Sequence, residues 1–306
     1  MCLWSKFSAK LSVAFLSLPS DKRGFQKSAR QIPVVIFLVL LCATTARAEG
    51  FILGVGADAD SVDGRAISAF GDFGVGEKTW LSATVSTFET NNVFGGMRTT
   101  FADAGIDHWF KPFGIRLGAS YWGNSDILDS VDLGTSVYFR GDKFMLSADY
   151  KNREFDFVIL SDFPDLRRKV AFSADGWGLT GRFSLSDSVS LHLGGMQFDY
   201  SRNIRIQQDI DSLRFLSSSR LSMINSLIDH RVSAGLEFKF GLRSIDLTAG
   251  SWQTAVDGGK VNSFSLGFLT PLSDRTDIEF RFSFDDSENF GNTTALSVYL
   301  YYFGGS

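Results

Sequence analysis

The stretch TDIEFRFSF, residues 276–284, decides the fold class. Apolar and polar side chains alternate along it, with Ile278, Phe280, Phe282 and Phe284 on one parity and Glu279, Arg281 and Ser283 on the other. Successive side chains of a β-strand point to opposite faces, so this strand has one apolar and one charged face. In a soluble sandwich the phenylalanines would face a core and the charges would face water. In a membrane barrel the phenylalanines would face lipid and the charges an aqueous interior.

The same alternation recurs along the chain and predicts fourteen strands, with twelve as the alternative. The expected strands are 51–60, 65–75, 79–89, 97–109, 113–123, 130–140, 143–155, 171–185, 188–200, 230–240, 243–253, 261–270, 277–286 and 294–303. Most of these segments have about 10–13 residues, whereas strands of soluble proteins usually have about 5–6 and membrane strands need about 9–11. Strand length therefore favours a membrane barrel.

The connections between these segments alternate in length. The tight ones are 76–78, 110–112, 141–142, 186–187 and 241–242, and the others include all the long ones, among them 155–170 and 201–229. Short turns at one end and long loops at the other are typical of outer-membrane barrels, whose short turns face the periplasm. We therefore expect both termini at the periplasmic end and the long loops outside the cell.

The two faces of the expected strands also differ in kind. One strand carries Val232, Ala234, Leu236, Phe238 and Phe240 on one face and Ser233, Gly235, Glu237 and Lys239 on the other. An apolar wall against lipid and a polar wall against a wet lumen explain this difference. Aromatic residues near strand ends are expected to form interfacial girdles, namely Trp80, Trp109, Phe110, Phe113, Tyr121, Trp122, Tyr301 and Tyr302.

On this pattern the chain resembles bacterial outer-membrane β-barrel proteins of the porin-like class, over the whole of residues 49–306. The fold class that the resemblance implies is all-β, a closed antiparallel transmembrane barrel in the outer membrane, in contact with lipid and lipopolysaccharide. The last segment, ALSVYLYYF at 295–303, is similar to the aromatic-ended signal that such barrels present to the barrel-assembly machinery. Here Gly-Gly-Ser follows Phe303, which departs from that signal.

Residues 1–48 differ in composition from the rest and are expected to be a signal peptide cleaved after Ala48. A basic region precedes the apolar run IPVVIFLVLLC, 32–42, and small residues follow at Ala46 and Ala48. Seven of the 30 bases and one of the 34 acids lie in this leader, so the barrel domain 49–306 has an excess of about ten acids. An acidic chain is a poor partner for nucleic acid. Both cysteines, Cys2 and Cys42, are in the leader.

The expected topology places ten charged or titratable residues in the half of the lumen nearer the periplasm. They are Asp107, Arg116, Arg140, Arg182, His192, Glu237, Lys239, Asp246, Glu279 and Arg281. One interpretation is a constriction whose field orients polar solutes. The other is a network of ion pairs that braces the wall and occludes the base. Four acids face five permanent cations, so we expect weak ion selectivity in either case.

The segment 203–229 breaks the alternation, because its leucines and isoleucines recur mostly at intervals of three or four residues. We expect one or two short amphipathic helices in this external loop. The loop could fold into the mouth as a lid, or it could pack on the rim as a surface cap. The cap is slightly favoured, because Arg214 and Arg220 would suit lipopolysaccharide phosphates.

The sequence gives little support for catalysis or for a bound cofactor. Ser190 and His192 share a face, but they are expected in the lumen near the periplasmic end, and a change of apolar parity after Gly194-Gly195 predicts a β-bulge. The three histidines show no metal-ligand spacing, and acid pairs such as Asp58 and Asp60 lack the spacing of a calcium loop. Phe70, Tyr138 and Trp252 face the lumen and could stack on sugar rings or simply pack.

The function expected from this pattern is a passive channel for small polar solutes. The alternative is an occluded barrel with a structural, adhesive or envelope-assembly role. A barrel-embedded hydrolase is the least favoured of the three, and we expect no enzyme activity, no cofactor and no metal.

Overall fold

The computed structural model describes residues 50–92, 95–124, 127–159, 168–204, 220–221 and 227–305. The expected leader 1–48 and its cleavage site after Ala48 lie outside the described residues, as do the helices expected within 203–229. Among the described residues there is no helix long and apolar enough to cross a membrane.

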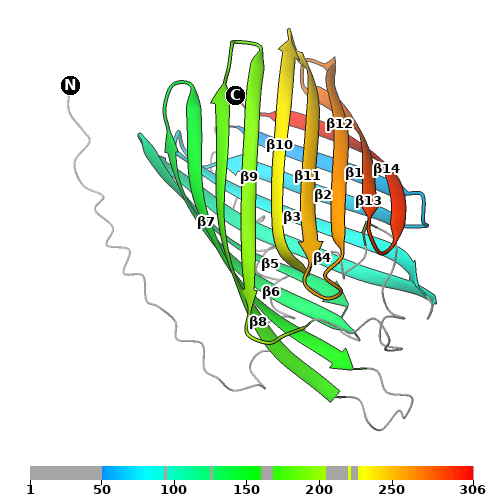
Figure 1. Cartoon of the computed structure of the whole chain (residues 1–306). Coiled ribbons are helices and arrows are strands. Elements are labelled where there is room, and N and C mark those ends of the chain that lie inside the picture. Colours follow the sequence, from blue (N-terminus) through cyan, green and yellow to red (C-terminus); the bar gives the residue numbers. More distant parts are fainter. Residues whose placement is uncertain are drawn as a thin grey trace, which may run out of the picture.

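Fourteen antiparallel strands form one closed barrel (Figure 1). They are β1 (Phe51–Asp60), β2 (Arg65–Gly74), β3 (Thr79–Asn92), β4 (Gly95–Phe110), β5 (Phe113–Asn124), β6 (Leu128–Arg140), β7 (Phe144–Ile159), β8 (Arg168–Ser184), β9 (Val189–Tyr200), β10 (Ile228–Phe240), β11 (Arg243–Thr254), β12 (Lys260–Ser273), β13 (Thr276–Ser287) and β14 (Gly291–Gly304). Each strand pairs with its neighbours in sequence, and β1 closes the barrel by pairing with β14, from Phe51↔Gly304 to Asp60↔Ala295. The prediction of fourteen strands is confirmed, and the alternative of twelve is wrong.

All connections longer than four residues lie at one end of the barrel. The end that holds the first residue of β1 and the last of β14 carries the connections 75–78, 111–112, 141–143, 185–188, 241–242 and 274–275. The opposite end carries 61–64, 93–94, 125–127, 160–167, 201–227, 255–259 and 288–290. By the convention of outer-membrane barrels the first end is periplasmic and the second external.

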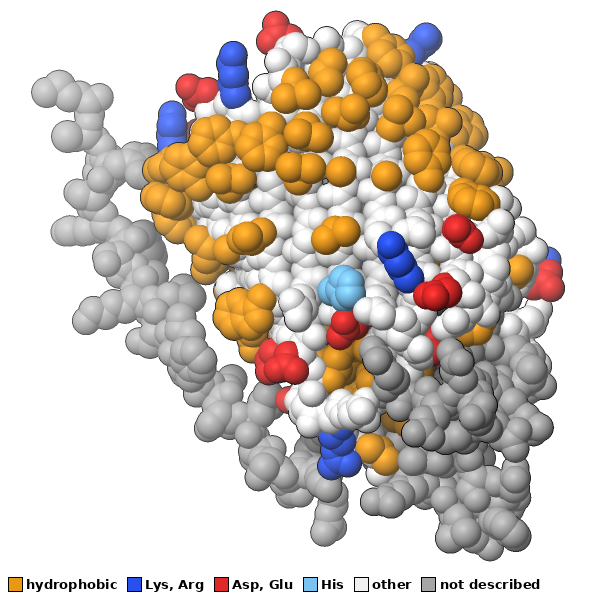
Figure 2. All heavy atoms as spheres, in the orientation of Figure 1, with side chains coloured by type: hydrophobic (Ala, Val, Ile, Leu, Met, Phe, Trp, Pro, Cys, Tyr) orange, Lys and Arg blue, Asp and Glu red, His pale blue; other side chains and the backbone are white. Residues whose placement is uncertain are grey.

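The outer wall of the barrel is apolar. Phe280 and Phe282 of the stretch TDIEFRFSF are 43% and 44% exposed, and Ile67 and Leu179 each reach 71%. Figure 2 shows hydrophobic side chains gathered in a band over the outer wall, with charged side chains toward both ends. Large exposed apolar areas are rare on soluble monomers, and a continuous band of them fits hydrocarbon.

The periplasmic edge of this band is aromatic, although only some of the expected girdle residues belong to it. Phe113 packs on Phe139 with ring centroids 5.4 Å apart, and Phe139 packs on Phe144 at 5.6 Å. Phe110 and Tyr302 are also exposed. The prediction is wrong for four of the expected residues. Trp109, Trp122 and Tyr301 lie on the inward parity of their strands, where they meet charged side chains. Trp80 pairs directly with Asp107 and so lies on the inward parity as well.

The expected β-bulge at Gly194-Gly195 is also wrong. The register of β9 runs without a shift against β8 and against β10 through these two residues. Met196 and Phe198 therefore stay on the inward parity, where both line an interior cavity. The apolar side chains change parity because the lumen itself becomes apolar at Met196 and Phe198, while the register of β9 stays the same.

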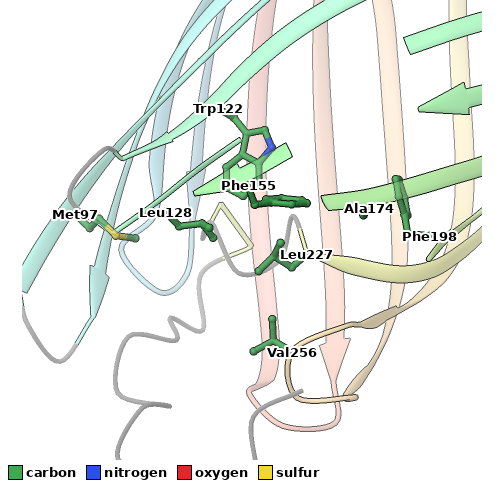
Figure 3. Close-up of a cluster of buried hydrophobic side chains, with 8 residues drawn as sticks. All are labelled: Met97, Trp122, Leu128, Phe155, Ala174, Phe198, Leu227 and Val256. Atoms are coloured by element: carbon green, nitrogen blue, oxygen red, sulfur yellow. The ribbon is translucent and has the colours of Figure 1, made fainter. Parts of the chain in front are cut away.

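The external half of the lumen contains a hydrophobic cluster of eight buried side chains (Figure 3). Six come from successive strands β4 to β9, namely Met97, Trp122, Leu128, Phe155, Ala174 and Phe198. The other two, Leu227 and Val256, come from the connections 201–227 and 255–259, which are joined where the Ala255 amide donates to the Leu227 carbonyl at 2.7 Å. Leu227 and Val256 thus lie inside the external half of the lumen, among side chains of the strands.

Candidate functional site

The polar inner wall is the candidate functional site, and its glycines make room for large side chains. A Cβ on Gly54 would lie 2.1 Å from the ring of Phe70, and a Cβ on Gly114 would lie 2.1 Å from the ring of Tyr138. Both glycines therefore let a neighbouring ring lie flat against the backbone. Tyr138 is buried and Phe70 packs on Tyr301 at 5.5 Å, so these two rings serve the wall itself.

The ten residues expected in the lumen lie on the inward parity, and the structure gathers most of them into three groups rather than one ring. The first group contains Asp107, which accepts hydrogen bonds from Arg116 Nη2 at 2.8 Å and from Tyr138 Oη at 2.7 Å. Beside this group the guanidinium of Arg140 lies over the ring of Trp109, 5.7 Å from its centroid. Asp72 on β2 is within electrostatic range of Arg116, so carboxylates offset the cations of this wall.

The second group is centred on Glu237 of β10. Its carboxylate lies 2.6 Å from Arg182 Nη2, 3.7 Å from His192 Nε2 and 3.8 Å from Lys239 Nζ. One carboxylate therefore meets two permanent cations and a histidine, and this wall has an excess of positive charge. His192 Nε2 makes no hydrogen bond to any described residue.

The third group lies on β11 to β14. Glu279 accepts hydrogen bonds from Arg281 Nη2 at 2.7 Å and from Tyr301 Oη at 2.6 Å. Asp246 faces this pair across Gly267, because a Cβ on Gly267 would lie 3.6 Å from both Asp246 and Arg281. Two carboxylates meet one cation here, so this wall has an excess of negative charge, opposite to that around Glu237.

A fourth charged group, which the sequence reasoning did not single out, lies nearer the external mouth. Asp132 of β6 is 2% exposed and meets Lys151 Nζ at 2.9 Å and Arg153 Nε at 3.2 Å, both on β7. The guanidinium of Arg153 also lies against the rings of Trp122, Phe155 and Phe198, 4.9–5.6 Å from their centroids. The inward parity of 143–155 already carried Lys151 and Arg153, so alternation was a sufficient signal for their position.

Two cavities of about 340 Å³ each lie inside the barrel and adjoin one another. The outer cavity is lined by Phe88, Thr99, Phe101, Trp122, Asp132, Lys151, Arg153, Met196, Phe198, Arg220, Leu221, Ile228 and Arg231. The inner cavity reaches from Arg231 and Lys151 to Arg116 of the first group. Lys151, Met196 and Arg231 line both. The two together trace a polar space from the external mouth toward the periplasmic half.

The connection 201–227 contributes two of its described residues to the outer cavity. Arg220 and Leu221 line this cavity, and Arg220 Nε lies 3.7 Å from Asp285 on β13. Leu227 is buried in the mouth cluster. These three described positions therefore lie at the mouth of the barrel, beside the outer cavity.

The histidines and the acid pairs are the residues that the sequence offered as candidates for catalysis and metal binding. Ser190 is buried, no hydrogen bond joins it to His192, and no group of three or more His, Cys, Asp or Glu is placed to hold a metal ion in the described part of the chain. Asp58 accepts from Tyr299 Oη at 2.9 Å, and Asp60 accepts from the amides of Val62 and Gly64. Both carboxylates therefore have partners within the chain.

Comparison with known proteins gives the fold but no family. No family model and no curated protein sequence matches the chain. Among solved structures, the CymD monoaromatic hydrocarbon channel aligns over 86% of this chain and 90% of its own, with a TM-score of 0.54 at 9% identity. A loop-deletion form of OmpT, an outer-membrane protein of Vibrio cholerae, aligns over 84% and 100%, with a TM-score of 0.46 at 9% identity. The chain thus has the fold of outer-membrane β-barrels of the channel and porin type.

Proposed function

We propose that this protein is a passive outer-membrane channel for small polar solutes. The observation that carries the proposal is the pair of adjoining cavities inside a closed barrel, polar and charged within and apolar without. A barrel of this kind brings water to the inner wall and hydrocarbon to the outer one. Solutes would enter at the external mouth, pass Lys151 and Arg231, and leave past the three charged groups of the periplasmic half.

The mechanism is diffusion through a lumen whose charges are nearly balanced. The excess of cations around Glu237 is offset by the excess of carboxylates around Glu279, so no single sign of charge lines the whole path. Rings of one charge sign produce strong ion selectivity, and their absence from these groups supports weak selectivity. The ten expected residues act in this proposal as the lining of the narrow periplasmic half.

Export and assembly form the remaining part of the proposal. Residues 1–48 would act as a cleaved signal peptide, and the strand ending at Phe303 would be presented to the barrel-assembly machinery. The apolar band would contact membrane lipid, and the external connections would contact lipopolysaccharide.

The second candidate function is an occluded barrel that works through its external surface. The observation that favours it is the mouth cluster, in which Leu227 and Val256 pack on strand residues inside the barrel. An apolar cluster in the mouth would hinder polar solutes if it stayed closed in the membrane.

Conductance separates the two candidates. Residues 49–306 would be refolded in detergent and added to a planar lipid bilayer in potassium chloride. Discrete current steps with a small reversal potential in a salt gradient are the result expected of the channel. A folded barrel that inserts without current steps would favour the occluded barrel, and a large reversal potential of either sign would contradict the balanced lumen.

A further inference from the structure

We infer that the outer cavity binds a small organic anion that carries an aromatic or similar apolar body. The inference rests on the proposed channel function and names the class of solute that the channel would hold on its way through. It is argued from three properties of the cavity wall, which are its charge, its apolar surface and an unpaired donor.

The charge of the outer cavity is positive. Among the residues that the structure describes, its lining includes the cations Lys151, Arg153, Arg220 and Arg231, and a single carboxylate, that of Asp132. Lys151 and Arg153 share this carboxylate, and Arg220 faces Asp285, which is not part of the lining.

Arg231 is the cation that this arrangement leaves uncompensated. It is exposed to the lumen, and its guanidinium makes no hydrogen bond or ion pair with a described residue. The carboxylate of Asp149 lies within its electrostatic range but accepts from Ser147 Oγ at 2.8 Å and faces the inner cavity. An anion in the outer cavity could therefore reach the Arg231 guanidinium and the Lys151 ammonium together, and a guanidinium binds a carboxylate in a two-point geometry.

The apolar part of the wall lies in the same cavity. Phe88, Phe101, Trp122, Met196 and Phe198 line it beside the cations. Rings and a thioether offer contact area to a flat apolar body and none to a hydrated inorganic ion. The cavity of about 340 Å³ is at the small end of the range of ligand sites, about 300–1,000 Å³. Chloride or acetate would use the cations and leave this surface without a partner.

An unpaired donor gives an independent indication of a ligand. Trp122 is 6% exposed, and its Nε1 is buried without a hydrogen-bond partner among the described residues. A buried donor without a partner costs free energy, and such groups usually meet an acceptor. An oxygen of a bound carboxylate would supply one in the cavity that Trp122 lines.

Benzoate is the probe that tests the inference, with binding measured by titration calorimetry on the refolded barrel of residues 49–306 in detergent. Three matched probes separate the contributions: benzyl alcohol has the ring without charge, acetate has the charge without the ring, and benzylammonium has the opposite charge. We expect benzoate to saturate one site and to bind at least about tenfold more tightly than each of the other three. Benzyl alcohol and benzylammonium lose the charge-assisted contact, and acetate loses the burial of the ring, and each loss has at least about that effect. Equal binding of benzyl alcohol or benzylammonium, or no saturable heat with benzoate, would overturn the inference.

Variants locate the site. Arg231→Gln should weaken benzoate binding about tenfold and leave benzyl alcohol unchanged, and Trp122→Phe should weaken benzoate while keeping an aromatic wall. Arg275→Gln, in the connection 274–275 at the periplasmic end, is the matched control and should change neither probe. Unchanged benzoate binding by a folded Arg231→Gln barrel would overturn the inference.

Conductance of the same preparations keeps this inference apart from the proposed function. A barrel that conducts but binds no benzoate would contradict the anion site and support the channel. A barrel that binds benzoate through Arg231 but carries no current would contradict the channel and support the anion site.

Discussion

Arg220 Nε, in the connection between β9 and β10, lies 3.7 Å from Asp285 Oδ2 on β13. Two strands, β11 and β12, separate β10 from β13 in the closed sheet, so this ion pair joins parts of the barrel rim that are not neighbours. It holds Arg220 and Leu221 over the outer cavity, which both residues line. The side chain of Asp285 is 6% exposed and that of Arg220 is 32% exposed, so the pair is partly shielded from water.

Replacing Asp285 with Asn should loosen this contact and widen the mouth. The Arg220 side chain is partly exposed, so the ion pair contributes about 1 kcal/mol or less. Losing it would change the ratio of barrels with a narrow mouth to barrels with a wide mouth by up to about fivefold. We expect Asp285→Asn to raise the mean single-channel conductance in a planar bilayer. Asp286→Asn is the matched control, because Asp286 is the next residue and lies on the outward parity of β13. Equal conductance of both variants would show that Arg220 does not narrow the path.

The buried group at Asp132 should dominate the stability of the external half. Asp132→Asn removes the carboxylate that Arg153, which is 5% exposed, meets at 3.2 Å. Breaking a buried pair in this way costs about 3–5 kcal/mol of the free energy of unfolding. Urea unfolding in detergent, followed by tryptophan fluorescence, would measure it, and Asp142→Asn in the connection 141–143 is the control.

A double variant tests whether this cost comes from keeping the Arg153 charge buried after its ion pair with Asp132 is lost. If it does, Asp132→Asn combined with Arg153→Met should be more stable than Asp132→Asn alone, because the apolar side chain suits the rings around it. A double variant less stable than the single one would show that Arg153 stabilises the barrel through its ring contacts instead.

The strands of this barrel were predictable from the sequence because a two-residue period marks both walls at once. TDIEFRFSF alternates without interruption, and the structure places Phe280 and Phe282 outside and Glu279 and Arg281 inside. A period of two fixes which face a residue takes once the strand is known. The lumenal placement of the ten charged residues followed from that rule alone.

The partners of those residues were not predictable in the same way. Arg182 on β8 reaches Glu237 on β10 across β9, and that pairing depends on the register of two strand pairs. The change of apolar parity after Gly194-Gly195 was misread as a β-bulge because alternation identifies lipid by apolarity, whereas the lumen itself becomes apolar at Met196 and Phe198. Trp109, Trp122 and Tyr301 were assigned to the girdles for the same reason.

A charge on the outer wall should cost more than a charge on the inner wall. Phe282→Arg places a cation in the apolar band, where it costs about 2–4 kcal/mol near the midplane of the bilayer. Ser233→Arg on β10 places the same cation in the lumen and should cost much less. Folded fractions after refolding into lipid vesicles at graded urea concentrations would rank the two. A larger loss for Ser233→Arg would mean that the two walls are assigned the wrong way round.

Glu237 should control the sign of the small ion selectivity. Its carboxylate is the one that meets Arg182, His192 and Lys239, so Glu237→Gln removes one negative charge from a wall that already has an excess of cations. We expect the reversal potential of this variant in a potassium chloride gradient to shift toward the equilibrium potential of chloride. Arg182 is 43% exposed, so its charge can be solvated by lumenal water and the barrel should stay folded. Lys239→Gln is the mirror variant and should move the potential toward potassium. Shifts of the same sign in both variants would show that ions do not pass this group.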